Sequence, residues 1–318
     1  MIMRILKWTG IVLLAALGVT AVMFWTPDTD PAAMRAKYGS PASQYVDLGD
    51  GLTVHFRDEG PRDAPVIVLL HGSNAFLQTW DAWAKLLSPT YRIIRLDLPG
   101  HGLTGAYPAR AYSKGAFVDV VDRTMVKLGI NQFVLGGNSM GGGVSWFYAH
   151  KHPEKLRGLL LVDASGQPEP ESQDLPIGFR IAQTPVLRDV MLYITPRSII
   201  EQSLQQSVTN QSVVTPANVD RYWELLRYPG NRQATIDRFA TPREPDVTGA
   251  PKQPIPTLIL WGADDKLIPA SSATWFKSQV PDAKVIIYPA VGHLLMEEIP
   301  ERSAADLSNW LATLPAPR

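Results

Sequence analysis

The chain of 318 residues contains no cysteine. Disulfide bonds, a lipid anchor attached to cysteine and metal sites built on thiolates are therefore excluded. Histidine is also scarce, and the six residues are scattered rather than spaced as a metal-binding array. We therefore expect neither a metal nor another cofactor.

Neither sign of charge is in excess, because 30 basic residues balance 30 acidic ones. A nucleic acid or another polyanion is therefore not an expected partner. No repeat or low-complexity tract divides the chain, and its length suits one large α/β domain with an additional cap. The oligomeric state stays open at this level.

Charge is absent from residues 8–25, a stretch about long enough to cross a bilayer as a helix, with a tryptophan at each end. Two basic residues precede it, so the positive-inside rule places the rest of the chain outside the cytoplasm. We predict an uncleaved membrane anchor over residues 1–26 and a tether over residues 27–43. The alternative is a secreted protein, released by signal-peptide cleavage after residues 19–21.

A glycine-rich motif surrounds Ser139, where the chain reads Gly-Gly-Asn-Ser-Met-Gly-Gly between an apolar run and a helical stretch. It has the form G-x-S-x-G of a nucleophile elbow, a turn so tight that only small residues fit two positions before and after the serine. The turn exposes the hydroxyl at a helix N-terminus, which favours developing negative charge. Ser139 is therefore the candidate nucleophile.

A serine nucleophile needs a carboxylate and a histidine, which follow it in that order in the architecture that uses the elbow. Both residue types come directly after late apolar runs. The run over residues 257–261 leads to Asp264 and Asp265, and the run over residues 284–288 leads to His293. The remaining histidines do not follow late strands, and we expect structural roles for them.

An earlier apolar run, residues 66–70, leads into His71-Gly72-Ser73-Asn74. This architecture places one half of its oxyanion hole at that position, and the other half at the residue after the nucleophile. We predict that the amides of Ser73 and Met140 bind the oxyanion, and that His71 braces the loop.

Together these motifs resemble the α/β-hydrolase superfamily, over residues 44–314. The resemblance implies a Ser139, Asp265 and His293 triad, because the family's late loop reads Gly-x-x-Asp-x-x-x-Pro and counting from Gly262 to Pro269 selects Asp265 over Asp264. The other matching segments are His71-Gly72, Asp97 to Gly102, and Gly292-His293 with Glu298 and Pro300.

Periodicity agrees with an α/β fold built on a mostly parallel twisted sheet flanked by helices. The core is expected in two parts, residues 44–164 and 257–318. A hairpin is predicted over residues 45–48 and 52–57, with strands at 66–70, 92–97, 132–136, 157–162, 257–261 and 284–288. Helices are predicted at residues 76–87, 113–128 with Ser113 as N-cap, 140–150, 271–279 and 300–314.

The alternation of strands and helices stops between residues 165 and 256, which we interpret as a helical cap inserted over the active site. Its predicted helices cover residues 184–194, 197–206, 216–228 and 231–240. Most of its aromatic side chains are expected to pack between the cap and the core. The candidates for substrate binding are Asn74, Phe179, Tyr193 and Trp223.

The resemblance implies a serine hydrolase that cleaves small-molecule carboxylic esters through an acyl-enzyme. Hydrolases of carbon–carbon bonds in ring-fission diketones share the Gly-Asn-Ser-Met-Gly-Gly elbow, and cofactor-free perhydrolases are a further alternative. Ser139 counts against the dehalogenases and epoxide hydrolases, which use an aspartate nucleophile. A membrane-tethered binding protein on a hydrolase scaffold is the non-enzymatic alternative.

Overall fold

A computed structural model describes residues 8, 18, 24–168, 176–241, 244–245 and 247–315. Within these residues, eight strands form one sheet in the order β1-β2-β4-β3-β5-β6-β7-β8. Strands β1 (Ser43–Asp47) and β2 (Thr53–Glu59) form the predicted hairpin, and β2 pairs antiparallel with β4.

All other pairings are parallel, so the predicted mostly parallel sheet flanked by helices is confirmed. Because parallel strands run in one direction, their carboxyl ends meet at one edge of the sheet. These strands are β3 (Val66–Leu70), β4 (Arg92–Leu96), β5 (Phe133–Asn138), β6 (Leu156–Val162), β7 (Thr257–Gly262) and β8 (Lys284–Tyr288).

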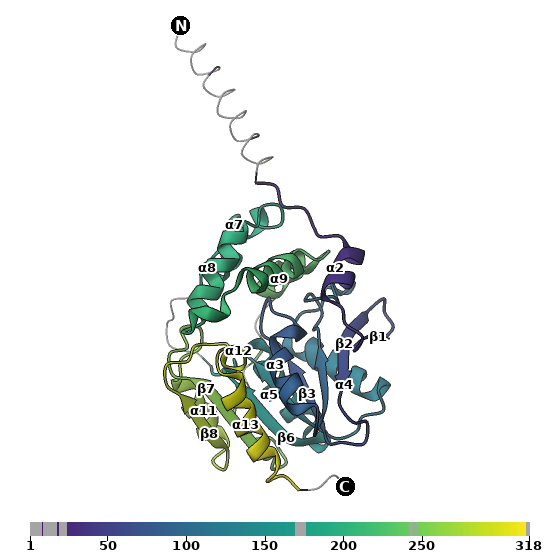
Figure 1. Ribbon diagram of the computed structural model, residues 1–318, viewed down its shortest axis with the longest axis vertical. Helices are drawn as coiled ribbons and strands as arrows, with labels where there is room; N and C mark the ends of the chain where they lie inside the picture. Colours follow the sequence, from purple (N-terminus) through teal and green to yellow (C-terminus); the bar gives the residue numbers. More distant parts are fainter. Residues whose placement is uncertain are drawn as a thin grey trace.

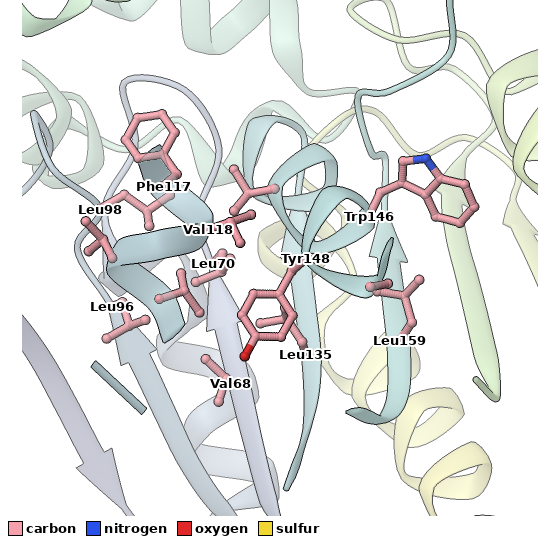
Figure 2. Close-up of a cluster of buried hydrophobic side chains, with 14 of the residues drawn as sticks. Val68, Leu70, Leu96, Leu98, Phe117, Val118, Leu135, Trp146, Tyr148 and Leu159 are labelled. Carbon is pink, nitrogen blue, oxygen red and sulfur yellow. The ribbon is translucent and has the colours of Figure 1, made fainter. Parts of the chain in front are cut away.

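Successive side chains of the strands enter two different hydrophobic clusters, as the two-residue period of a strand requires. In β3, Val68 and Leu70 belong to the cluster shown in Figure 2, together with side chains of the helices on that face. Ile67 and Leu69 belong to the second cluster, on the other face. The first face is covered by α4 (Lys114–Lys127), α5 (Met140–Lys151) and α11 (Ser271–Gln279), and the second by α3 (Asp81–Leu87) and α13 (Pro300–Leu311).

Local signals set several of the helix boundaries. Ser113 caps α4 as predicted, since its side chain accepts a hydrogen bond from the Ala116 amide at 3.2 Å. The stretch predicted as one helix over residues 76–87 begins instead as a 3₁₀ turn before α3. The short elements are η1 (Leu77–Trp80), η2 (Pro153–Lys155) and α12 (Leu295–Glu298).

The described residues between β6 and β7 form helices and their connections, and Figure 1 shows α7, α8 and α9 at one end of the sheet. The predicted helix over residues 184–194 was wrong. Pro185 and the left-handed Val186, with φ of 69°, interrupt it, so only one turn remains. These elements are α6 (Ile177–Gln183), α7 (Leu187–Val190), α8 (Arg197–Ser207), η3 (Gln211–Val213), α9 (Pro216–Leu226) and α10 (Asn231–Ala240).

Residues 27–43, which we predicted as a tether, contain helix α2 (Pro31–Tyr38). Its N-cap is Asp30, whose side chain accepts a hydrogen bond from the Ala33 amide at 2.7 Å, and proline occupies the first helical position. An Asp followed by Pro was the sequence signal for this helix start.

The same segment is bound to the inserted helices. Arg232 of α10 donates to Asp28 at 2.7 Å, and Tyr38 donates to Glu224 of α9 at 2.6 Å. Residues 28–38 are thus part of the folded structure, and α2 lies beside α9 in Figure 1.

Among the described residues, no helix has both the length and the apolar character needed to cross a bilayer. The anchor predicted over residues 1–26 lies almost wholly outside the described residues.

Two isoleucines on neighbouring strands provide a test of the core. Ile259 in β7 is fully buried, whereas Ile287 in the edge strand β8 is 43% exposed. We expect Ile259→Ala to lower the free energy of unfolding by about 2–5 kcal/mol, because it leaves a cavity. Ile287→Ala should cost about 1 kcal/mol or less. Urea unfolding measures both values, and equal losses would contradict the burial of Ile259.

Candidate active site

Ser139 lies in a strained turn between β5 and α5, with φ of 54° and ψ of −118°. Its amide donates to the Val162 carbonyl at 3.0 Å, which ties the turn to the end of β6. A Cβ added to Gly137 would lie 2.2 Å from the Gly141 carbonyl carbon, and one added to Gly141 would lie 2.4 Å from the Leu70 carbonyl oxygen. Side chains at these two glycines would therefore open the turn.

Of the two adjacent aspartates, the structure brings Asp265 to the histidine. The Nδ1–H of His293 donates to Asp265 Oδ2 at 2.7 Å, and both side chains are buried. The other oxygen of Asp265 accepts from the amides of Leu267 at 2.8 Å and Ile268 at 3.1 Å. Because the Nδ1–H of His293 is used in the hydrogen bond to Asp265, Nε2 is the ring nitrogen able to accept a proton.

Asp264 is exposed, and its amide donates to the Val291 carbonyl at 2.9 Å. The loops after β7 and β8 therefore pack directly on each other. Gly262 permits this approach, because a Cβ there would lie 2.1 Å from the Gly292 carbonyl oxygen.

Asn138 is a site residue that we did not single out from the sequence. Its buried amide donates to the carbonyl of Val162 at 3.3 Å and to that of His293 at 3.1 Å. It thus joins the nucleophile turn to the histidine loop. Its place directly before the serine was the only sequence signal.

Glu298 holds the histidine loop from the other side. Its buried carboxylate accepts from the Gly292 amide at 3.0 Å and from the amides of Thr209 and Asn210 at 2.9 and 2.8 Å. The His293 amide itself donates to the Ser207 carbonyl at 2.9 Å. The inserted helices therefore help to position the histidine.

The loop predicted to supply the oxyanion hole lies against Ser139. A Cβ added to Gly72 would lie 3.2 Å from the Ser139 Cβ, so this residue allows a close backbone approach. Ser73 lines the same cavity as Ser139. Met140 is the first residue of α5, and its N–H has no acceptor within the helix.

His71 braces this loop. Its Nε2 accepts from the Leu98 amide at 3.0 Å, and its Nδ1–H donates to the Gly72 carbonyl at 2.7 Å. Complete burial lowers the pKa of His71, so the neutral ring is the form that makes both hydrogen bonds.

Two cavities meet at Ser139, and both are also lined by Ser73, Phe179 and Leu267. The first cavity, of about 110 Å³, is also lined by His293. The second, of about 470 Å³, is also lined by Met140 and Arg238. The segment between β6 and β7 contributes apolar residues to the first cavity, among them Phe179, Ala182, Met191, Leu192, Ile200, Leu204, Leu226 and Ile236.

The four candidates for substrate binding are divided by the structure. Asn74 and Phe179 line the first cavity, whereas Tyr193 and Trp223 line neither cavity at this site, which corrects our assignment. Tyr193 is exposed and stacks on Trp25 at 5.2 Å between ring centroids.

Trp223 is held away from the cavities by its own contacts. Its indole N–H donates to the Thr195 carbonyl at 2.7 Å, and the Arg227 guanidinium lies 3.6 Å above its ring. Trp223 therefore packs within the inserted helices, whereas Tyr193 lies at the surface against Trp25.

The chain is similar to known proteins of one fold family. The sequence profile of a family described as alpha/beta hydrolase fold matches residues 65–300. A 2-hydroxymuconate semialdehyde hydrolase of Pseudomonas putida is 26% identical to the chain over 283 residues, which cover 88% of this chain and 98% of that protein.

Among solved structures, one described as a membrane phospholipase A and a novel bacterial virulence factor is similar with a TM-score of 0.74 and 25% identity. The match covers 96% of this chain and 97% of that one. A thermophilic esterase from Thermogutta terrifontis has the same fold, with a TM-score of 0.70 and 24% identity over 85% of this chain and 98% of that one.

The two adjacent aspartates form a matched pair for mutation. We expect Asp265→Asn to lower turnover of an ester by about 10⁴, the loss known for a histidine held in the wrong tautomer. Asp264→Asn should have only a small effect, because its side chain is exposed. Turnover is measured on one ester at saturating concentration, and the reverse ranking would refute the assignment.

Proposed function

The chain belongs to the α/β-hydrolase family, and from this premise we propose that it is a serine hydrolase that cleaves carboxylic esters through an acyl-enzyme. The observation that carries the proposal is the buried Asp265–His293 hydrogen bond, at the cavity that Ser139 lines.

In the proposed mechanism, His293 accepts the Ser139 proton on Nε2 as the hydroxyl oxygen attacks the carbonyl carbon. Asp265 holds the ring tautomer and stabilises the imidazolium. His293 then protonates the leaving alkoxide, the alcohol departs, and a water activated by the same ring releases the acid.

The developing oxyanion would be bound by the amides of Ser73 and Met140. Support comes from the start of α5 at Met140 and from the close approach of Gly72 to the elbow. Loss of one such donor typically lowers turnover by about 10²–10³.

The apolar lining of the first cavity supports an ester with a hydrocarbon chain or an aryl group. Its inserted-helix wall includes Met191 and Leu192, next to α7, and Leu204 of α8. Burial of such a group contributes about 0.8 kcal/mol per methylene to binding, so chain length should affect KM.

Hydrolysis of a carbon–carbon bond is the second candidate. The observation that favours it is Arg238, which donates to the Ser73 hydroxyl and lines the second cavity. Burial lowers the pKa of Arg238 only to about 10, so it stays a cation at neutral pH, and an acidic substrate would complement it. Two hydrolases of 2-hydroxymuconate semialdehyde are among the relatives, at 26% and 24% identity.

We also propose that the enzyme is anchored in a membrane by residues 1–26, with its catalytic domain outside the cytoplasm. Secretion after cleavage is the alternative. Exposed apolar side chains at the end of this segment and around α7 support the anchor, since such side chains suit a lipid surface. Phe24 and Trp25 end the segment, and Trp25 stacks on Tyr193. The others lie in or beside α7 and are Val186, Leu187 and Val190.

Replacement of the nucleophile tests the chemistry. We expect Ser139→Ala to lower ester turnover by about 10⁴ or more with the thermal unfolding midpoint retained, because only the reacting hydroxyl is lost. The assay is a panel of p-nitrophenyl esters of increasing chain length, beside a vinylogous 1,5-diketone with a carboxylate.

Activity within tenfold of the unmodified enzyme would refute the serine mechanism. Faster turnover of the diketone than of every ester would favour the second candidate. A fluorophosphonate probe that labels the unmodified protein but not Ser139→Ala separates both enzymes from a binding protein.

Two truncations test the anchor. Removal of residues 1–23 should give a soluble, active enzyme, because every group of the site is retained. Removal of residues 1–38 should also lower the unfolding midpoint, since the contacts of Asp28 and Tyr38 with α10 and α9 are lost.

Full-length protein should stay with membranes in carbonate, because an inserted helix is not held by surface charge. Release by carbonate would contradict the anchor, and a mature soluble form that begins near Val22 would establish signal-peptide cleavage.

A further inference from the structure

Asp163, at the end of β6, is a buried acid that the proposed mechanism does not use. Its side chain is fully buried, and its backbone has φ of 43°, a conformation that is uncommon outside glycine. Its amide donates to the Leu260 carbonyl at 3.0 Å, and its Oδ1 accepts from the Gly262 amide at 2.8 Å. The carboxyl group is therefore held rigidly between β6 and β7.

The second oxygen of Asp163 is buried without a hydrogen-bond donor within the described part of the chain. Its surroundings are Asp265 and His293, and one carboxylate or ring atom from each of the three residues lies within 4.8 Å of the others. Asp265 already accepts three hydrogen bonds and has no donor to offer while it is ionised.

Two ionised carboxylates in this buried space would repel each other, and an orphaned acceptor would add its own cost. One proton on Asp163 removes both costs, because it supplies the missing donor. We propose that the Oδ2 of Asp163 is protonated and donates to the carboxylate of Asp265, which makes Asp163 a positioning residue for the Asp265–His293 pair. This inference rests on the proposed function.

The charges around Asp163 act in the same direction. Burial, then the charge of Asp265, raises its pKa well above the ordinary range, and Glu298 adds to the effect. Glu298 is occupied by three backbone amides, and the nearby Tyr288 hydroxyl donates to Asp306. The amide of Gly262 opposes the rise in the pKa of Asp163 and is the weaker influence.

This hydrogen bond has a consequence for catalysis. A hydrogen bond donated by Asp163 fixes the carboxylate of Asp265 and partly neutralises its charge. The carboxylate then stabilises the imidazolium form of His293 less strongly. Without the donor, the stronger charge on Asp265 would keep His293 protonated to higher pH. The acidic limb of kcat/KM would then move to higher pH, since the neutral ring is the base.

Two substitutions separate the proposal from a structural role. Asp163→Asn keeps an oxygen for the Gly262 amide and puts an N–H where the carboxyl O–H was, but it does not ionise. Asp163→Ala removes the donor. We expect the acidic limb to keep its position in Asp163→Asn, and in Asp163→Ala to move up by about 0.5–1 pH unit with about tenfold lower kcat.

The Asp163 variants can also be compared by a measurement that does not depend on turnover. This measurement is the NMR titration of His293 in full-length, histidine-labelled protein in detergent. The background is Ser139→Ala, and the His293 signal is identified by its loss in His293→Gln. We expect the His293 titration to have the same midpoint in Ser139→Ala and in Ser139→Ala with Asp163→Asn. The midpoint should be higher in Ser139→Ala with Asp163→Ala.

If Asp163 carried a negative charge, its removal in Asp163→Asn would lower the His293 midpoint by about one unit or more, and this result overturns the proposal. The same His293 midpoint in Ser139→Ala alone, with Asp163→Asn and with Asp163→Ala would also overturn the proposal. Should Asp163→Ala fail to fold, the Asp163→Asn comparison still decides the protonation state. Absence of ester turnover in the unmodified enzyme would refute the proposed function and leave the titration result standing.

Discussion

The tight turn at Ser139 is the constraint on which the site depends. A left-handed serine between β5 and α5 is stable only because neighbouring backbone closes around it, with Gly137 and Gly141 in contact and the Val162 carbonyl bound to its amide. Packing and hydrogen bonding with the sheet thus stabilise the strained backbone of Ser139. Because the turn starts α5, the same feature presents the hydroxyl and leaves the Met140 amide without a helical acceptor.

The remaining groups reach Ser139 because parallel strands end at one edge of the sheet. The loops after β7 and β8 are packed backbone to backbone at Gly262, which brings Asp265 to His293. The inserted helices contribute as well, since the Ser207 carbonyl accepts from the His293 amide and Phe179 lines both cavities. These helices therefore shape the substrate space and also hold the proposed base.

Much of the fold was predictable from local patterns. Central parallel strands such as β3 are short apolar runs of β-branched and leucine residues, and their period decides which of Ile67 and Val68 enters which cluster. Glycine spacing identified the elbow, and the resemblance to the family's Gly-x-x-Asp-x-x-x-Pro loop, counted from Gly262 to Pro269, separated Asp265 from Asp264. The failures lie where local signals conflict or are weak. Pro185 divided one predicted helix, and the Asp30-Pro31 start of α2 was overlooked.

By itself, the sequence determined the α/β fold, the positions of its strands along the chain and the residues of the candidate triad. These features follow from hydrophobic period and motif spacing, which act over a few residues. Only the tertiary structure decided that Phe179 lines the cavities whereas Tyr193 and Trp223 do not, that Asn138 joins the elbow to the histidine loop, and that Asp163 lies beside Asp265. Each of these outcomes depends on which segments of the chain meet after folding, and local sequence patterns carry no information about such contacts.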